Sequence, residues 1–289
     1  MPNLLHISDI HFGPPFHSEV GEALLRFAEE AEPDVIVASG DFTQRAKEEQ
    51  FREARTFLER LPKVPVIVTP GNHDVPLYRV GERLLDPYRH YRTYISNDLD
   101  TVTTVPGAVI VALNSTAPRM AITNGRIHAW QLDFARRAFD GVPDDVQRIL
   151  VAHHHFAPPP DFEGAAAMPK ARRALDVFTA LKVDLILGGH LHRAYIGNSL
   201  DVYSGADRDH GIAIVQAGTG TSRRGRARER EKNSFNLLRL DERMIRVTHY
   251  MYFEASEGFV PTSRHIFFRG GRPPMTQDEA EQGAFYFDP

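Results

Sequence analysis

Short, mostly apolar runs that do not alternate with polar residues recur along the chain. Runs of this kind are typical of strands that are covered on both faces. They predict seven strands, at residues 3–8, 34–39, 64–69, 108–114, 148–153, 183–188 and 211–218. Between many of them, apolar residues recur at the spacing of one helix face, which predicts helices at residues 18–32, 46–61, 128–139 and 169–182. This alternation indicates βαβ units and a largely parallel sheet.

The end of the chain has a different pattern. Residues 233–253 contain two apolar stretches joined around "DERM", which predicts an antiparallel pair of strands in a second sheet packed on the first. The charged segment 224–231 is predicted to be a loop. The polar stretch 270–283, rich in Pro and Gly, predicts a loosely ordered extension. Because we find no repeat and no linker, we predict one domain at residues 1–269 and a C-terminal extension at 270–289.

Composition narrows the class of protein. The 289 residues are 42% apolar, enough for one large core. A net charge of −4 argues against strong nucleic-acid binding and against an anionic membrane surface as partner. The absence of cysteine excludes disulfides and thiolate metal sites. No apolar stretch is long enough to span a bilayer, and the N-terminus lacks the features of a secretory signal, so we expect a cytoplasmic protein.

Five of the predicted strands end in side chains that bind metal ions or transfer protons. These side chains are Asp9 and His11 in "SDIHFG", Asp41 in "SGDF", Asn72, His73 and Asp74 in "GNHD", His153, His154 and His155 in "AHHHF", and His190 and His192 in "GGHLH". In an open α/β sheet, ligands bind at the carboxyl ends of the strands. Residues two apart in an extended backbone point to the same side, so both members of a pair can reach one ion.

The ligand types indicate which ion is expected. Imidazole, carboxylate and amide oxygen without sulfur suit Mn²⁺, Fe²⁺, Zn²⁺ or Co²⁺ better than Ca²⁺ or Mg²⁺. The candidates are too many for one catalytic ion, and they suit two ions about 3.5–4 Å apart that share a bridging carboxylate. Two divalent ions would outweigh the charges of Asp9 and Asp41, so the site favours an anionic substrate such as a phosphate.

In this order, the motifs D-x-H, GD, GNHD, HH and GHxH resemble those of the calcineurin-like metallophosphoesterase superfamily. They span residues 9 to 192, about two thirds of the chain. Each motif alone is weak, whereas the set is highly specific. "LLHISDIHFG" and the tail "GTGTSRRGRARE…NSFNLLRL" are similar to bacterial members near the class III cyclic-nucleotide phosphodiesterases.

The resemblance implies a fold and a metal centre. The fold would be α/β, an αββα sandwich of two packed mixed sheets flanked by helices. One ion would be bound by Asp9, His11, Asp41 and His192, and the other by Asp41, Asn72, His153 and His190, with Asp41 bridging. Mn²⁺ or Fe²⁺ are the expected ions, with Zn²⁺, Co²⁺ or Ni²⁺ as alternatives. A metal-bridging hydroxide would attack phosphorus. His73 would lie near the phosphate as electrophile or general acid, and Asp74 would orient it.

Three positions keep alternatives open. In "HHHF", where many relatives have a proline soon after the His pair, we prefer His153 as the ligand because it is nearest the strand. His154 and Arg193 are candidate substrate-binding residues, and a solvated loop position is an equal alternative for Arg193. The arginine cluster at 223–230 is diluted by glutamates, which favours a solvated charge run over substrate steering.

Together these features predict a metal-dependent phosphoric ester hydrolase with a small phosphoester substrate. We favour a phosphodiesterase on small phosphodiesters or cyclic nucleotides. A phosphomonoesterase on the same centre is the alternative. The excess of acidic over basic residues makes a nuclease less favoured. A non-catalytic scaffold is the alternative of a different class, and the intact ligands at every motif argue against it. The sequence does not indicate an oligomeric state.

Overall fold

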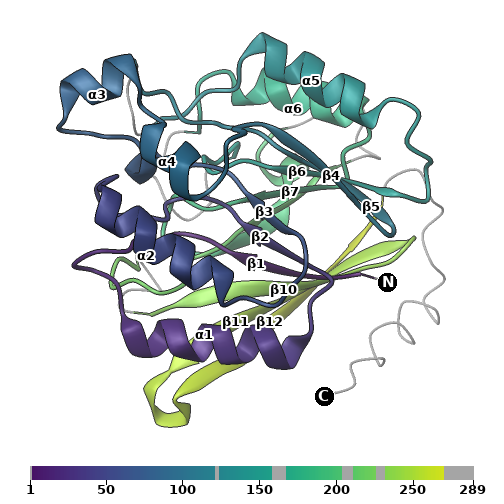
Figure 1. Cartoon of the computed structure of the whole chain (residues 1–289). Coiled ribbons are helices and arrows are strands. Elements are labelled where there is room, and N and C mark those ends of the chain that lie inside the picture. The colour runs from purple at the N-terminus through teal and green to yellow at the C-terminus, as the bar shows by residue number, and fades with distance from the viewer. Residues whose placement is uncertain (1, 121–123, 158–166, 204–210, 226–231, 270–289) are drawn as a thin grey trace.

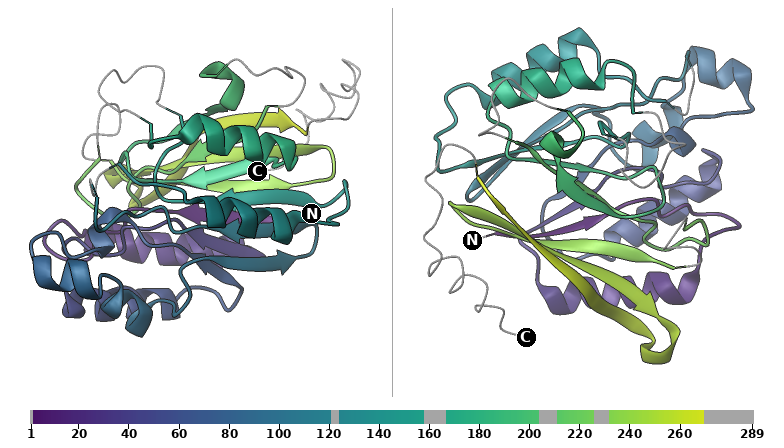
Figure 2. Two further views of the ribbon diagram at one scale, coloured as in Figure 1. Left: turned by 90° about the horizontal axis from the view of Figure 1, so that it is seen from above. Right: turned by 180° about the vertical axis from the view of Figure 1, so that it is seen from behind.

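The computed structural model describes residues 2–120, 124–157, 167–203, 211–225 and 232–269. These residues form two six-stranded sheets that pack face to face, with helices over the outer face of each sheet (Figures 1 and 2). The prediction of an αββα sandwich is confirmed. The predicted extension at 270–289 and most of the charged segment 224–231 lie outside the described residues. Within the described part of the chain, no helix has the length and apolar character needed to cross a membrane.

The first sheet combines the first and last strands of the described chain, in the order β12-β11-β10-β1-β2-β3. Its parallel strands are β1 (Asn3–Ile7), β2 (Val35–Ala38) and β3 (Val66–Val68). Its antiparallel strands are β10 (Ser234–Leu240), β11 (Met244–Phe253) and β12 (Gly258–Phe268). Helices α1 (Ser18–Ala31) and α2 (Glu48–Glu59) connect the parallel strands.

The C-terminal hairpin extends this first sheet. We predicted that residues 233–253 would belong to a second sheet packed on the first, and that prediction was wrong. β10 pairs with β1, where Leu4 lies opposite Leu238, and β11 and β12 continue the sheet outward. Because β2 covers only one edge of β1, the backbone donors and acceptors on the other edge need a partner, and the hairpin supplies it.

The second sheet holds the middle of the chain in the order β4-β5-β6-β7-β9-β8. Its strands are β4 (Thr101–Val105), β5 (Ala108–Ala112), β6 (Gln147–Val151), β7 (Leu185–Gly188), β8 (Tyr195–Asn198) and β9 (Ala213–Gln216). Helices α5 (Ala129–Phe139) and α6 (Ala171–Ala180) cover its outer face. The prediction of one largely parallel sheet was wrong, because after β3 the chain passes through α3 (Val80–Leu85) and α4 (Arg89–Tyr94) into the edge of the second sheet.

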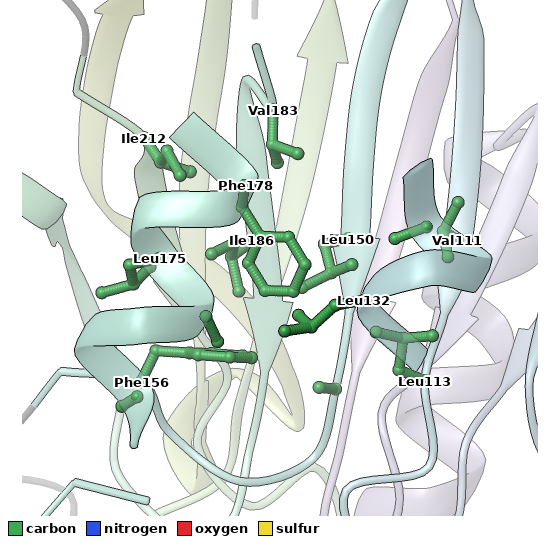
Figure 3. Close-up of a cluster of buried hydrophobic side chains, with 14 of the residues drawn as sticks. Val111, Leu113, Leu132, Leu150, Phe156, Leu175, Phe178, Val183, Ile186 and Ile212 are labelled. Carbon is green, nitrogen blue, oxygen red and sulfur yellow. The ribbon is translucent and has the colours of Figure 1, made fainter. Parts of the chain in front are cut away.

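Three buried clusters explain why the strand sequences do not alternate. In β1, Leu4 belongs to the cluster between the sheets, and Leu5 packs with the helices over the first sheet. In β5, Ile110 faces the first sheet, whereas Val111 belongs to the cluster under α5 and α6 (Figure 3). Since both faces of these strands are covered, successive positions are apolar.

A buried ion pair joins the two sheets at the end opposite the predicted site. Arg269 follows β12 of the first sheet, and Asp184 precedes β7 of the second. The guanidinium donates from Nε to Asp184 Oδ1 at 2.9 Å and from Nη2 to Oδ2 at 3.0 Å, and it also donates to backbone carbonyls of Asp145 and Glu242. The two side chains are only 3% and 5% exposed. The Asp184 carboxylate also accepts the backbone N–H of Arg148 at 2.9 Å, but Arg269 is the cation that balances its buried charge.

We expect Arg269→Ala to lower the free energy of unfolding by about 3–5 kcal/mol, because it leaves the Asp184 carboxylate buried without its counter-charge. Urea unfolding at neutral pH measures the change. Arg239→Ala is the matched control, since Arg239 is exposed on β10 and its loss should stay within about 0.5 kcal/mol. If Arg269→Ala were as mild as the control, the pair would not hold the sheets together.

Candidate metal centre

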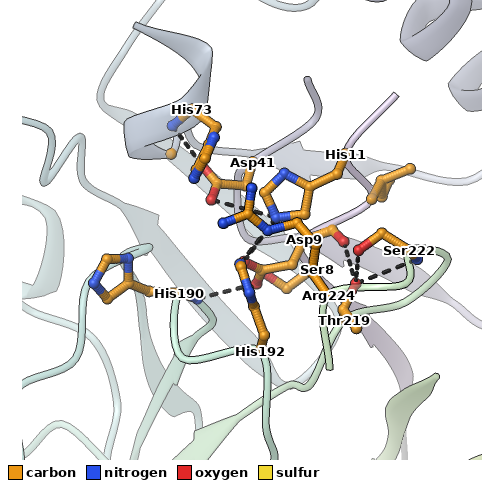
Figure 4. A network of polar contacts seen from close by, with 12 residues as sticks. Ser8, Asp9, His11, Asp41, His73, His190, His192, Thr219, Ser222 and Arg224 are labelled. Carbon is orange, nitrogen blue, oxygen red and sulfur yellow. Dashed lines mark hydrogen bonds and ion pairs between the residues drawn. The ribbon is translucent and has the colours of Figure 1, made fainter. Parts of the chain in front are cut away.

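The predicted metal ligands follow the carboxyl ends of strands from both sheets. They are Asp9 and His11 after β1, Asp41 after β2, Asn72 after β3, His153 after β6, and His190 and His192 after β7. The two sheets place these strand ends side by side. In Figure 4 the side chains of Asp9, His11, Asp41 and His192 point toward a common point. The strand ends that the sequence pointed to therefore meet at one edge of the sandwich.

Five of these residues have a left-handed backbone. φ is 54° at Asp9, 55° at His11 and Asp41, 77° at His190 and 54° at His192. This conformation costs a non-glycine residue about 1–2 kcal/mol, and such strain is concentrated at functional sites. We predicted that an extended backbone would turn paired residues to one side. The structure gives a different cause, because the chain leaves the extended conformation at each of these positions and the turns aim the side chains inward.

The first predicted ligand set forms a compact buried cluster. The donor atoms of Asp9, His11, Asp41 and His192 all lie within 4.8 Å of one another. His192 Nε2 is 3.1 Å from Asp9 Oδ1 and 3.0 Å from His11 Nε2. His11 Nε2 is 3.6 Å from Asp9 Oδ1. Two imidazoles and two carboxylates therefore face one small volume.

The second predicted set lies beside the first and shares Asp41. Asn72 Oδ1 is 2.9 Å from His190 Nδ1 and 3.2 Å from His153 Nε2. Asp41 Oδ2 is 3.4 Å from His153 Nε2 and 3.7 Å from His11 Nε2, so this one oxygen lies between the two sets. Its other oxygen, Oδ1, accepts a hydrogen bond from the backbone N–H of His73 at 2.8 Å.

Backbone carbonyls fix the orientation of two imidazoles. His11 Nδ1 lies 3.3 Å from the carbonyl of Thr43, and His153 Nδ1 lies 2.8 Å from the carbonyl of Ser39. A carbonyl only accepts, so each Nδ1 donates its proton, and Nε2 is the atom of each ring that faces Asp41. A neutral imidazole held in this way is a typical metal ligand.

The buried carboxylates of the centre favour the binding of a cation. Neither Asp9 Oδ1 nor Asp41 Oδ2 accepts a hydrogen bond from a described residue, although both side chains are buried. Burial opposes ionisation, but the neighbouring imidazoles outweigh it and hold the pKa of both carboxyls well below the usual range. For His153, burial opposes protonation, and the Asp41 carboxylate outweighs it and raises the pKa to about 9. Divalent ions with nitrogen and oxygen ligands fit this donor set.

His73 lies at the side of the cluster. Its ring centre is 4.8 Å from that of His11, and burial lowers its pKa. We predicted that Asp74 would orient His73, and the structure corrects this. His73 Nδ1 is 2.9 Å from the carbonyl of Gln44. The Asp74 carboxylate instead accepts backbone N–H bonds from Thr43 and Gly71, each at 2.9 Å, so it holds together the turns that carry Asp41 and Asn72.

The two predicted substrate-binding residues are both buried. His154 Nδ1 is 2.8 Å from Ser115 Oγ, and its ring lies 4.7 Å from that of His190, one of the predicted ligands. Arg193 is 3% exposed, which excludes the solvated-loop alternative. A contact of either residue with substrate stays a prediction.

Sequence reasoning missed a loop that supports the centre. Between β9 and β10, Thr219 Oγ1 donates to the carbonyl of Asp9 at 2.7 Å, and Thr221 Oγ1 donates to the carbonyl of Ile10 at 2.9 Å. The same loop brings Arg224 to the centre (Figure 4), where its Nη1 donates to Gln44 Oε1 at 2.9 Å. The signal in the sequence was the segment "GTGTSRR", which is similar to bacterial relatives, but we had interpreted its arginines as part of a solvated charge run.

Gly71 is essential to the geometry because a Cβ there would overlap the carboxylate and the backbone nitrogen of Asp41. We expect Gly71→Ala to displace Asp41 and to lower Mn²⁺ affinity at least as much as loss of a supporting contact, about 10- to 100-fold. Calorimetric titration with Mn²⁺ measures this. Gly81→Ala in α3 is the control, since no described atom lies within 4 Å of the added carbon. Equal affinities in the two variants would show that Asp41 tolerates the shift.

Comparisons with known proteins agree with this geometry. Residues 2–194 match the model of a family described as calcineurin-like phosphoesterases. A probable cyclic nucleotide phosphodiesterase of Rhodococcus erythropolis is 28% identical over 208 residues, which are 65% of this chain and 64% of that protein. This chain thus matches somewhat less than two thirds of that relative's length. A cAMP/cGMP dual specificity phosphodiesterase of Mycobacterium tuberculosis is 26% identical over 241 residues, which are 75% of this chain and 71% of that protein.

Among solved structures, the fold is similar to that of a purple acid phosphatase from yellow lupin (Lupinus luteus) seeds. The TM-score is 0.71 at 14% identity, and the match covers 96% of this chain and 57% of that one. At this identity the likeness concerns the fold alone.

Proposed function

Because the chain belongs to the calcineurin-like phosphoesterase family, we propose that it is a binuclear metal-dependent phosphodiesterase acting on small phosphodiesters or cyclic nucleotides. One observation carries the binuclear assignment. Asp41 Oδ2 is buried, accepts no hydrogen bond from a described residue, and lies 3.4 Å from His153 Nε2 and 3.7 Å from His11 Nε2. An anionic oxygen that lies between two sets of candidate ligands is suited to bridge two cations.

The residues divide between the two ions as follows. Asp9, His11, Asp41 and His192 would hold one, and Asp41, Asn72, His153 and His190 would hold the other. Mn²⁺ or Fe²⁺ are the proposed ions, with Zn²⁺, Co²⁺ or Ni²⁺ as alternatives. When bound, two such ions supply positive charge for the phosphoryl oxygens and lower the pKa of water toward neutrality.

His73 is the proposed proton donor to the leaving group. Its backbone N–H is held by Asp41 Oδ1, and its Nδ1 donates to the carbonyl of Gln44. With Nδ1 engaged, the ring presents Nε2 to the substrate, and a protonated Nε2 donates to the leaving oxygen as the P–O bond breaks. The negative charge that would otherwise develop on that oxygen is thereby neutralised.

The preference for small diesters has two supports. Two curated relatives carry names that specify cyclic-nucleotide phosphodiesterase activity. Long nucleic acid needs many phosphate contacts along a basic surface, and this chain has 34 Lys and Arg against 38 Asp and Glu.

A substrate panel with Mn²⁺-loaded protein tests the proposal. It compares bis(4-nitrophenyl) phosphate, cyclic AMP, 4-nitrophenyl phosphate, and single- and double-stranded DNA. We expect the small diesters to be hydrolysed faster than the monoester and DNA. Turnover of the monoester alone would identify a phosphatase on the same centre, and faster cleavage of DNA would identify a nuclease. Metal binding without turnover of any substrate would favour a non-catalytic scaffold.

A further inference from the structure

A row of buried polar side chains crosses the inner face of the first sheet, close to the carboxyl end of β1. His6 on β1 lies opposite Asn236 on β10, and Asn236 lies opposite His249 on β11. All three side chains are buried. The next positions on the same face, Leu4 and Leu238, belong to the apolar cluster between the sheets. The row therefore interrupts a face that is otherwise apolar.

His6 connects this row to a predicted ligand of the metal centre. His6 Nε2 lies 3.0 Å from Ser39 Oγ, and the backbone carbonyl of Ser39 accepts the Nδ1–H of His153 at 2.8 Å. Ser39 is buried, and its own backbone N–H donates to the carbonyl of Ile7 in β1 at 2.9 Å. Ser39 thus contacts His6 through its side chain and His153 through its backbone.

The polar row does not serve the stability of the fold well. Among the described residues, neither Nδ1 of His6 nor Nδ2 of Asn236 has a hydrogen-bond partner, although both atoms are buried. A buried polar atom without a partner destabilises the folded state. Burial also lowers the pKa of His6 to about 3, so the ring is neutral near pH 7 and forms no ion pair.

An apolar side chain at position 6 would continue the inner face without this cost. Departures from the local pattern that lower stability are expected at functional sites. The one hydrogen bond that His6 makes is the contact with Ser39, so the function of His6 is to be sought there.

We propose that His6 is a positioning residue for the metal centre, which holds Ser39 so that its carbonyl keeps His153 Nε2 directed toward Asp41. His153 Nε2 lies 3.4 Å from Asp41 Oδ2. Because His153 belongs to the second of the two ligand sets, this role rests on the proposed function, which assigns one ion to each set. Loss of the contact therefore weakens the binding of one ion and leaves the other in place.

The test removes both partners of the contact at once. His6→Leu combined with Ser39→Ala replaces the pair by apolar groups, a change that is typically neutral or stabilising for a buried hydrogen bond. We expect a melting temperature equal to or above that of the wild type. The affinity for one of the two Mn²⁺ ions should fall about 10- to 100-fold, the usual effect of losing a group that orients a ligand. Calorimetric titration of the full-length protein with Mn²⁺ measures the affinities.

Further variants show how the effect is transmitted. His6→Gln should keep the wild-type Mn²⁺ affinities, because its amide replaces the imidazole as hydrogen-bonding partner of Ser39. In His153→Ala protein, the double change should cause no further loss, since the effect passes through that ligand. His249→Leu is the control, because it removes a buried histidine from the same row, two strands away from β1. Its Mn²⁺ affinities should equal those of the wild type.

The outcomes separate this role from the proposed function. A wild-type protein that binds two Mn²⁺ ions but hydrolyses no phosphoester would overturn the proposed function alone. At most one ion in the wild type would overturn the binuclear centre and the role of His6 with it. Two ions in the wild type, with unchanged affinities in the double variant, would overturn only the role of His6. That role would also be wrong if the double variant lost melting temperature and both ions together, or if His249→Leu lost the same affinity.

Discussion

Asp41→Asn is expected to remove both metal ions and to lower turnover of a small diester by more than about 100-fold. Loss of a group that merely supports a ligand already costs about 10- to 100-fold, and Asp41 belongs to both predicted ligand sets. An asparagine keeps one oxygen that accepts from the backbone N–H of His73. It replaces Oδ2, which faces His11 and His153, by an NH₂ group that cannot bind a cation.

Elemental analysis of protein prepared with saturating Mn²⁺ measures this, with two ions per chain expected in the wild type. Asp144→Asn is the matched control, because Asp144 is an exposed carboxylate that precedes β6, at the end of the sheet opposite the centre. Loss of only one ion in Asp41→Asn would show that Asp41 does not bridge. At most one ion in the wild type would overturn the binuclear centre itself.

His73→Ala is expected to lower turnover by about 10²–10⁴ while metal content stays unchanged, which is the usual contribution of general acid–base assistance. The structure explains why the metal should remain. Asp41 is held by the backbone N–H of residue 73, and an alanine keeps that group. The loss should shrink for diesters with good leaving groups such as 4-nitrophenolate, since these need little protonation.

A series of diesters with leaving groups of increasing pKa measures the dependence. His265→Ala, on β12 of the first sheet and outside the centre, is the control for a histidine lost elsewhere. A loss that is equal for good and poor leaving groups would assign His73 an electrostatic role. Loss of metal along with activity would make His73 a ligand.

The sequence could indicate where the candidate ligands gather, because each of them follows the end of a strand. An apolar run followed by Asp41 or His153 is a local signal, and the meeting of carboxyl ends follows from the topology of parallel strands. The sequence could not predict how the strands divide between the two sheets. β1 and β6 are both buried on two faces, and such runs do not reveal their neighbours. β12 escaped notice because it is an exposed edge strand with Pro261 in its middle.

Local sequence patterns also did not reveal which groups hold the side chains of the centre in place. The carbonyl of Gln44 holds His73, and a backbone carbonyl has no signature in a sequence. We chose Asp74 for that task because it is adjacent in the chain, whereas its carboxylate points to other backbone groups. The contact between Thr219 and Asp9 joins residues 210 positions apart, so nothing near Arg224 indicated where its side chain would lie.

The place of β1 in its sheet has a consequence for how the chain folds during synthesis. Leu4 pairs with Val35 on one side and with Leu238 on the other, so the central strand is completed only when the last strands have left the ribosome. Contacts this distant in sequence slow folding. Until then β1 presents an open hydrogen-bonding edge, which is a template for association with other nascent chains. The turn that carries Asp9 and His11 is therefore finished late, after translation has passed residue 240.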